Sequence, residues 1–330
     1  MSIPALKEVR FWLLVAAFAA VVATLVVPRV KLQRDIYDVL AVVDITSSMN
    51  TRDVDAAGTA ESRLEATKEA LRSLLASLPC QSRMGLAIFT ERQTFLLFNP
   101  VEVCANFAAL DDSIAELNWR MAWEGNSYVA KGLFDAVEKA ESLKTDLIFF
   151  TDGHEAPPLP FSGLPPFMSK LGEVGGLIVG VGGHAMTPLV KYDDEGREAG
   201  TYGAQDLPQE NRAGPPPPDA ASRPGYHPKW APFGNEVVDN NEHMAFVREP
   251  HLHELSKVTG LSYVLLKPGE SLLPALERAV KPRRVSVASD VRQYPAGFAL
   301  LILTLLYGAL PILDAVGARK GRAPAASSRS

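Results

Sequence analysis

Three oxygen-bearing side chains stand at alternate positions in one short segment, Asp44-x-Thr46-x-Ser48. They follow an unbroken apolar run, Val39–Val43, which is typical of a strand buried on both faces of a parallel sheet. Alternate residues of an extended loop point the same way, so these side chains can converge on one point. One carboxylate with hydroxyls suits a hard cation such as Mg²⁺, Ca²⁺ or Mn²⁺. The alternative is a helix N-cap, where Ser and Thr are also preferred.

A second carboxylate and a further hydroxyl are expected at the same place. Asp152 comes just after the apolar run Leu147–Phe150, and Ser127 stands in a loop that opens the helix expected at Val129–Leu143. Open α/β sheets bind ligands at the carboxyl ends of their strands. We therefore expect one divalent-cation site whose ligands are Asp44, Thr46, Ser48, Ser127 and Asp152.

The elements that must position these residues alternate between strands and helices. This order predicts an α/β fold, a doubly wound, mostly parallel sheet with helices on both faces. Helices are expected at Ala60–Leu78, Ala105–Leu117, Val129–Leu143, His251–Thr259 and Leu272–Val280. Further strands are expected at Arg83–Thr90, Gln93–Phe98, Asp146–Phe150, Leu177–Val181 and Ser262–Leu266. Only Glu91 and Arg92 separate the first two of these strands, so they form a hairpin that gives the sheet one antiparallel edge strand.

Two uncharged apolar runs flank this pattern, each long enough to cross a bilayer. We expect transmembrane helices at 11–28 and 296–316, a cytoplasmic tail at 1–10 and a basic cytoplasmic tail at 317–330. The first run is interpreted as a retained anchor, with a cleaved signal peptide as the alternative. Short basic tails favour the cytoplasm, so the domain at 35–281 is expected in the periplasm, tethered to the lipid of a bacterial inner membrane.

The pattern breaks between about 188 and 250. Leu189–Tyr192 and Glu198–Tyr202 predict a small hairpin, and a proline-rich stretch from Pro215 to Pro232 follows it. So long a stretch without regular structure is usually functional or disordered. Two interpretations of this stretch remain, a disordered or loosely packed linker and a loop that faces a partner. Because the insertion follows the strand at Leu177–Val181, we expect it beside the cation site.

Charge and cysteine content narrow the partners and the compartment. The formal net charge is −5 and no stripe of Lys and Arg occurs, which gives no support for nucleic-acid binding. Cys80 precedes one strand of the hairpin and Cys104 follows its antiparallel partner, so both are expected at the opposite edge from the cation site. We expect a disulfide between them in an oxidising compartment; two free thiols are the alternative.

The order of the three ligand segments resembles a known family. Asp44-x-Thr46-x-Ser48, a loop hydroxyl at Ser127, and a strand ending Thr151-Asp152-Gly153 resemble the metal-ion-dependent adhesion site of von Willebrand factor type A domains. The resemblance covers roughly residues 35–281. It implies that Thr46 and Ser48 ligate the cation directly, and that the other three do so directly or through water. It also implies an open coordination position for an Asp or Glu carboxylate of a protein partner.

Two positions depart from the commonest pattern of that family, because Thr46 stands where Ser is usual and Ser127 where Thr is usual. Both keep an oxygen donor, so the resemblance still implies metal binding, but it implies no particular affinity or metal preference. Mg²⁺ is the expected ion, with Ca²⁺ and Mn²⁺ as alternatives.

The sequence gives little support for catalysis. Thr46 stands where an aspartyl phosphatase would need a second Asp, and no Gly-x-Ser-x-Gly elbow occurs. Gly180–Gly183 lacks the third glycine of a dinucleotide site. We interpret His154 and Glu155 as solvent-facing loop residues, with an acid/base role as the alternative. His251 and His253 are interpreted as surface residues of a helix and not as a metal pair.

The expected function is therefore a non-enzymatic, metal-dependent binding module. Pro100–Asn106 and Arg120–Ser127 resemble membrane-anchored bacterial proteins encoded with methanol dehydrogenase. That resemblance implies a role in assembly or maturation of a periplasmic enzyme, including calcium insertion, alongside other membrane or periplasmic maturation proteins. Two alternatives are an envelope-stress or aerotolerance component that works with a MoxR-type ATPase, and a metal-assisted hydrolase.

Overall fold

The computed structural model describes residues 3–26, 30–56, 59–121, 126–156, 159, 163–206, 218–219, 222 and 243–312. The chain divides into two compact units. One unit is residues 35–283, and the other combines residues 1–34 with residues 284–330.

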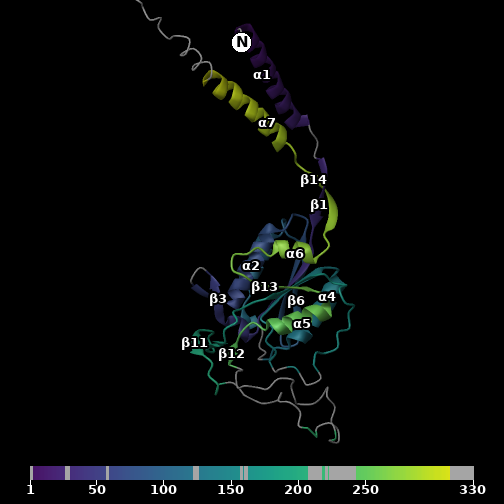
Figure 1. The fold of residues 1–330 in the computed structure, drawn as a ribbon, viewed down its shortest axis with the longest axis vertical. Coiled ribbons are helices and arrows are strands. Elements are labelled where there is room, and N and C mark those ends of the chain that lie inside the picture. The colour runs from purple at the N-terminus through teal and green to yellow at the C-terminus, as the bar shows by residue number, and fades with distance from the viewer. Residues whose placement is uncertain are drawn as a thin grey trace, which may run out of the picture. The chain divides into compact units, whose positions relative to one another are not determined.

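A six-stranded sheet forms the centre of the unit at 35–283 (Figure 1). Its strands in spatial order are β13 (Ser262–Leu265), β8 (Gly176–Gly180), β7 (Asp146–Thr151), β2 (Asp38–Asp44), β5 (Arg83–Thr90) and β6 (Gln93–Glu102). All neighbours pair in parallel except β5 and β6, which form an antiparallel hairpin. The predicted fold class, a mostly parallel sheet with one antiparallel edge strand, is confirmed. The strand that leads into Asp44 is central, with neighbours on both sides.

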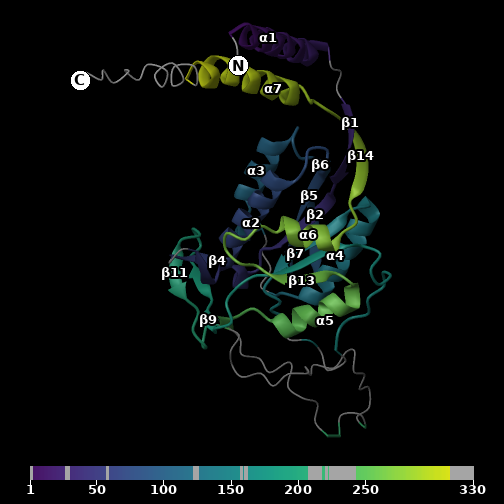
Figure 2. The same cartoon turned by 45° about the horizontal axis from the view of Figure 1, so that its top comes forward.

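Helices cover both faces of this sheet, as Figures 1 and 2 show. On one face α2 (Arg63–Ser77), α3 (Phe107–Ala115) and α6 (Leu273–Ala279) share a core with alternate residues of β2. On the other face α4 (Val129–Leu143) and α5 (Glu249–Thr259) bury the intervening residues of the same strand. Because both faces of β2 are buried, the strand is apolar at every position from 39 to 43.

The helix predicted at Ala60–Leu78 begins later than expected, at Arg63. Residues 59–62 instead form β4 (Thr59–Ser62), which pairs antiparallel with β3 (Arg52–Ala56). Ser62 caps the helix, since its hydroxyl accepts a hydrogen bond from Glu65 N at 3.2 Å. Ser-x-x-Glu is the capping-box spacing, so the true start was present in the sequence. The β3–β4 hairpin itself was not predicted.

The insertion is partly folded onto the unit. β10 (Val190–Tyr192) pairs antiparallel with β11 (Glu198–Thr201), close to the predicted hairpin. β9 (Thr187–Pro188) pairs with β12 (Met244–Ala245), so the insertion leaves and returns at neighbouring points. The Tyr192 ring lies 4.7 Å from the ring of Trp119, and Arg52 pairs with Glu198 at 2.6 Å. The predicted proline-rich stretch falls largely at 207–217 and 223–242, outside the described residues.

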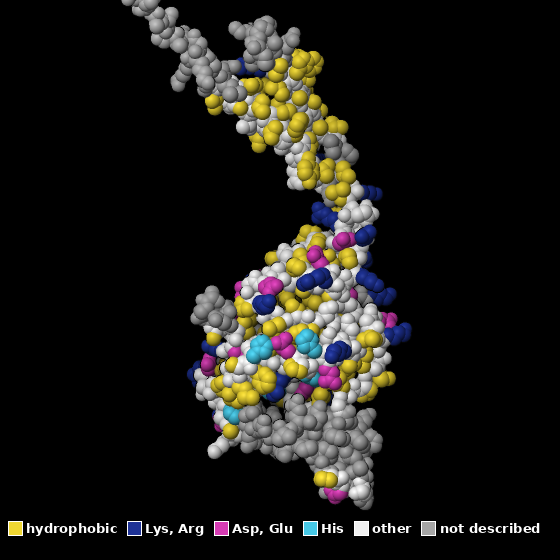
Figure 3. Space-filling model, in the orientation of Figure 1, with side chains coloured by type: hydrophobic (Ala, Val, Ile, Leu, Met, Phe, Trp, Pro, Cys, Tyr) yellow, Lys and Arg dark blue, Asp and Glu magenta, His cyan; other side chains and the backbone are white. Residues whose placement is uncertain are grey.

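The second unit contains the two terminal helices, α1 (Ile3–Val26) and α7 (Gln293–Thr304), the latter continued by a π-helical turn, η4 (Leu305–Ala309). Within the described residues, two helices are long and apolar enough to cross a membrane, over Val9–Val26 and Gln293–Ile312. Apolar side chains cover much of the surface of this unit in Figure 3. Phe11, Trp12 and Phe298 are among its exposed residues. Strands β1 (Val30–Ile36) and β14 (Arg283–Ser289) pair with each other at the junctions to the central unit.

Candidate metal centre

The loop after β2 gathers the first three predicted ligands. It turns at once into a short 3₁₀ helix, η1 (Ser47–Asn50), and Thr46 lies within hydrogen-bonding range of both Asp44 and Ser48. Thr46 donates twice to Oδ1 of Asp44, from its amide at 2.9 Å and from its hydroxyl at 2.7 Å. The hydroxyl oxygens of Thr46 and Ser48 lie 3.4 Å apart. The side chain of Thr46 does not cap η1, which counts against the helix-cap alternative.

Asp44 is fully buried and its second carboxylate oxygen is also engaged. Oδ2 accepts a hydrogen bond from the hydroxyl of Thr151, at the end of the neighbouring strand β7, at 2.7 Å. Burial, followed by the nearby charge of Asp152, raises the pKa of the Asp44 carboxyl to about 7 despite these hydrogen bonds. A buried carboxylate of this kind is stabilised by a bound cation, because the cation restores the attraction that water would otherwise supply.

Asp152 follows β7 and is also excluded from solvent. Its Oδ2 accepts a hydrogen bond at 2.5 Å from Nη1 of Arg63, the first residue of α2. Its Oδ1 accepts the amide of His154 at 3.0 Å. Burial alone would lower the pKa of Arg63, but hydrogen bonds and charges of Asp53 and Asp152 outweigh it and raise that pKa. Arg63 is therefore a permanent positive charge beside the site.

Ser127 stands between β5 and β7 in space. Its backbone bridges in parallel to Glu91 and antiparallel to Ala156, with 2.7 Å hydrogen bonds in both directions to Ala156. These bridges hold it at the carboxyl edge of the sheet, where Asp44 and Asp152 also lie. Its hydroxyl is buried and has no hydrogen-bond partner within the described part of the chain. A buried polar atom without a partner is costly, so this oxygen is a candidate ligand.

The donor set fits a hard divalent cation. Two ligands about 2.1–2.5 Å from one ion and at right angles lie about 3.0–3.5 Å apart, which includes the spacing of the Thr46 and Ser48 oxygens. The Thr46 hydroxyl donates a hydrogen bond to Asp44, so the lone pairs of the hydroxyl oxygen remain available to a metal. The unpartnered hydroxyl of Ser127 adds a third oxygen. Asp44 and Asp152 already accept hydrogen bonds on both oxygens, which suits ligands that act partly through water.

Sequence reasoning missed two residues of this site. Thr151 orients Asp44, and its position just before Asp152 in the strand-ending Thr-Asp-Gly was the available signal. Arg63 was missed because the predicted helix began at Ala60. That start placed Arg63 inside the helix and gave no reason to expect its side chain at the edge of the sheet. Thr90, at the end of β5, carries another buried hydroxyl without a partner among the described residues.

The interpretation of His154 and Glu155 as solvent-facing was wrong. His154 is only 6% exposed, and the Glu155 side chain is 8% exposed. Glu155 accepts the amide of Ala130 in the first turn of α4 at 2.7 Å and pairs with His251 at 3.0 Å. These contacts bury the loop after β7 against the starts of α4 and α5. His253 is exposed on a different side of α5 and contacts the ring of Tyr263, so His251 and His253 do not form a pair.

The amino edge of the sheet lies at the other end of β2. Asp38, the first residue of that strand, pairs with Arg83 and with Arg283, each at 3.0 Å. Asp38 lies near the point where the chain enters the central unit, and Arg283 is where the chain leaves it. This ion pair therefore joins the two ends of the unit. Six residue steps along β2, about 20 Å, separate Asp38 from Asp44.

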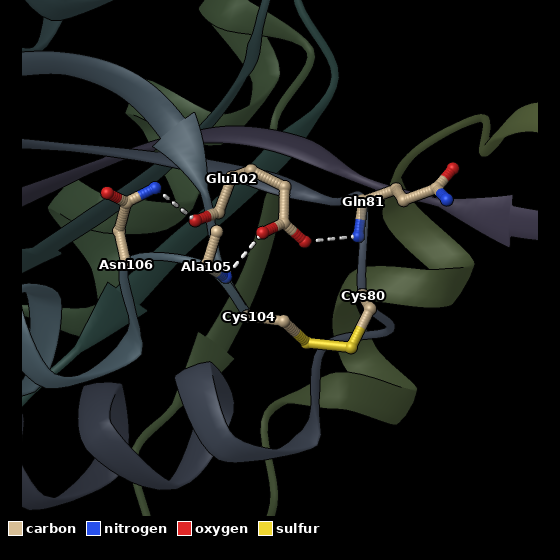
Figure 4. Close-up of a disulfide and its surroundings, with 6 residues drawn as sticks. All are labelled: Cys80, Gln81, Glu102, Cys104, Ala105 and Asn106. Carbon is tan, nitrogen blue, oxygen red and sulfur yellow. Dashed lines mark hydrogen bonds between the residues drawn. A yellow bond between two sulfur atoms is a disulfide. The ribbon is translucent and has the colours of Figure 1, made fainter.

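Cys80 and Cys104 are joined by a disulfide in the structure, with their Cα atoms 5.2 Å apart (Figure 4). The bridge links the turn before β5 to the turn after β6. Between the two cysteines, Glu102 accepts the amides of Gln81 at 2.6 Å and Ala105 at 2.5 Å (Figure 4). These hydrogen bonds lower the pKa of Glu102 and fix both loops that carry the sulfur atoms.

Residues 39–154 match the family model described as the von Willebrand factor type A domain. The matched region runs from β2 to the loop after β7 and includes all five predicted ligand residues. With the sheet order above, this match shows that the chain contains a von Willebrand factor type A domain, a class of domain that mediates protein–protein interaction and is generally non-catalytic. No curated protein matches the chain.

Solved structures with similar folds include an aerotolerance-related membrane protein from Bacteroides fragilis, at 13% identity, TM-score 0.45, covering 74% of this chain and 98% of that one. BatB from Bacteroides thetaiotaomicron is similar at 14% identity and TM-score 0.43, covering 72% of this chain and 94% of that chain. A mussel byssus thread matrix protein with a zinc-occupied metal-ion-dependent adhesion site is similar at 16% identity and TM-score 0.29, covering 41% and 34%. The family assignment depends on the family match and not on these likenesses.

Proposed function

We propose that this protein is a membrane-tethered binding module that grips a carboxylate of a protein partner through a divalent cation at the carboxyl edge of its sheet. Thr46, Ser48 and Ser127 would hold the cation, with Asp44 and Asp152 behind them. The bound cation would supply Lewis acidity at one open coordination position. Mg²⁺ is the ion we propose, with Ca²⁺ and Mn²⁺ as alternatives.

The observation that carries this proposal is the buried hydroxyl of Ser127. It lies at the same sheet edge as the Asp44–Thr46–Ser48 cluster and has no partner among the described residues. A helix cap is not formed by Thr46, and it would give no reason for a buried hydroxyl on a separate loop that has no partner among the described residues. A cation explains both, because it takes oxygen ligands from several segments at once.

The path of the chain supports a membrane tether at both ends of the central unit. The central unit begins and ends near Asp38 and Arg283, which pair with each other at the amino edge of the sheet. The apolar helices join the unit at those ends of the chain. We therefore propose that both helices span the inner membrane, that both termini are cytoplasmic, and that the domain between them lies in the periplasm.

As the cellular setting we propose assembly or maturation of a periplasmic enzyme such as methanol dehydrogenase, including its calcium insertion. The support is the resemblance carried by Pro100–Asn106 and Arg120–Ser127, of which 122–125 lie outside the described residues. The protein would act there with other membrane or periplasmic maturation proteins and would bind without turnover.

Capture of the partner tests the binding role. The full chain, purified in detergent and immobilised, is exposed to a periplasmic extract of its own organism with Mg²⁺ or with EDTA. We expect a partner that is retained only with Mg²⁺ and that is lost with Thr46→Ala. Thr145→Ala is the matched control, since Thr145 is also a buried threonine but lies at the amino edge, before β7. Retention that is the same with EDTA would overturn the proposal.

A further inference from the structure

Arg63 is a fully buried arginine that touches the candidate cation site without belonging to its ligand set. Its guanidinium donates to Asp152 Oδ2 at 2.5 Å and lies 3.4 Å from the backbone oxygen of Ser48. On the other side it donates from Nε and Nη2 to the two carboxylate oxygens of Asp53, at 2.9 and 2.5 Å. The side chain therefore bridges two carboxylates, one of which is a predicted ligand.

The surrounding backbone fixes this arginine in place. Asp53 Oδ2 also accepts the amide of Gly183 at 3.0 Å, so the loop after β8 holds the carboxylate that holds the guanidinium. Gly182 has a φ of +123°, and a Cβ there would meet Nε and Cζ of Arg63. The chain thus leaves room for the guanidinium at this position, and a two-sided fork is what arginine provides and lysine does not.

The charge of Arg63 changes what a cation would experience. Asp44 and Asp152 together bring two negative charges to the site. Arg63 returns one positive charge directly onto Asp152, and a further carboxylate, Asp53, lies on the other side of the guanidinium. Two unneutralised carboxylates would cancel the charge of a divalent ion and leave little attraction for a third carboxylate. With Arg63 in place, part of the ion's charge remains for an outside ligand.

We propose that Arg63 is a positioning and charge-balancing residue that makes the site bind its cation less tightly so that the cation binds a partner's carboxylate more tightly. This inference rests on the proposed function. It assigns to Arg63 an opposite effect on the two ligands of the site, cation and carboxylate, which a merely structural role would not produce.

Binding of Mn²⁺ and acetate to the full chain in detergent tests the inference. Mn²⁺ affinity is measured from water proton relaxation, and acetate is then added to the Mn²⁺-loaded protein to displace bound water. For Arg63→Gln we expect Mn²⁺ to bind about tenfold more tightly, because one positive charge is removed, and acetate to bind about tenfold more weakly. Arg63→Lys keeps the charge and loses the fork, so its Mn²⁺ affinity is expected within about threefold of the wild type.

A melting experiment guards against a variant that folds poorly. We expect the rise in Tm on adding Mn²⁺ to be larger in Arg63→Gln than in the wild type, even where its Tm without the ion is lower. If both variants bind Mn²⁺ and acetate more weakly in proportion to a fall in Tm, Arg63 is only structural and the inference is overturned. If the wild type itself binds no Mn²⁺, the proposed function fails with it.

Discussion

Nη1 of Arg63 lies 2.5 Å from Oδ2 of Asp152, and both side chains are shielded from solvent. The two residues are 89 positions apart in the sequence, at the first turn of a helix and just past the end of a strand. Their contact joins the helix that follows the Asp44 loop to the loop that follows β7. A ligand position of the candidate site is therefore set by a residue that no ligand motif contains.

Gly182→Ala tests how closely the structure fits around Arg63. The new methyl group would meet the guanidinium, on a backbone whose positive φ disfavours any side chain. Gly200→Ala is the control, because Gly200 also has a positive φ, +105°, and nothing lies near its added Cβ. We expect Gly182→Ala to lower the free energy of unfolding by about 1–3 kcal/mol more than Gly200→Ala. Equal losses in chemical denaturation would show that the contact with Arg63 contributes nothing.

Asp146→Asn tests a pH dependence that originates at the amino edge. Burial, opposed by a hydrogen bond from Gly175 and aided by the charge of Asp38, raises the pKa of Asp146 to about 6. The folded protein then holds this proton more tightly than the unfolded chain does. The contribution of Asp146 to the free energy of unfolding is therefore greatest at about pH 4 and below, and it is lost as the pH rises through about 6. The amide variant cannot ionise, and we expect it to be more stable than the wild type at pH 8 by on the order of 1 kcal/mol after solvent screening is allowed for.

Thermal melting from pH 4 to pH 8 measures this effect. The stability advantage of the Asp146→Asn variant should shrink toward pH 4. There Asp146 of the folded wild type is protonated and is therefore uncharged, like the amide of the variant. A difference between variant and wild type that is constant over this range would contradict the assignment.

The disulfide predicts a sensitivity to reduction. Cys80 and Cys104 close a loop of 24 positions, and removal of such a bridge typically costs about 2–4 kcal/mol of stability. We expect reductant, or the double change Cys80→Ser and Cys104→Ser, to lower Tm while leaving cation binding intact, because the bridge lies at the opposite edge from Asp44. Mass measurement after alkylation, with and without reductant, gives the oxidation state. Two freely alkylated thiols in protein taken directly from cells would rule the bridge out.

His154→Ala separates binding from catalysis. The backbone amide of His154 positions Asp152, and alanine retains that amide, so we expect the variant to bind the cation and the partner nearly as the wild type does. A metal-dependent hydrolytic activity that is present in the wild type and lost in this variant, with cation affinity unchanged, would show that the protein is an enzyme.

Local pattern was enough to predict most of the sheet. Arg83–Thr90 was predicted with the bounds that the structure has, because its apolar run ends in polar residues at both ends. Val129–Leu143 was predicted equally well, since its amphipathic spacing extends over four turns. The family resemblance is also confirmed over residues 39–154, where the family model matches.

What escaped prediction either lacks an apolar pattern or depends on contacts between distant segments. The β3–β4 hairpin pairs short polar strands, which have no apolar alternation to reveal them. The burial of His154 and Glu155 comes from α4 and α5 closing over their loop, and polar composition alone suggested solvent. The role of Arg63 required knowing that Asp53 and Asp152 flank it, and neither carboxylate has a fixed spacing from it.

Direct titration tests whether the site at the carboxyl edge of the sheet binds a divalent cation. Mg²⁺ and Mn²⁺ are titrated calorimetrically into the full chain in detergent, for the wild type, Asp44→Asn and Asp146→Asn. Both variants neutralise a carboxyl whose pKa is raised chiefly by burial, one at each edge of the sheet. We expect one bound ion per chain in the wild type and in Asp146→Asn, and a loss of at least about tenfold in affinity in Asp44→Asn. Absence of binding to the wild type, or equal affinity in all three proteins, would contradict this expectation.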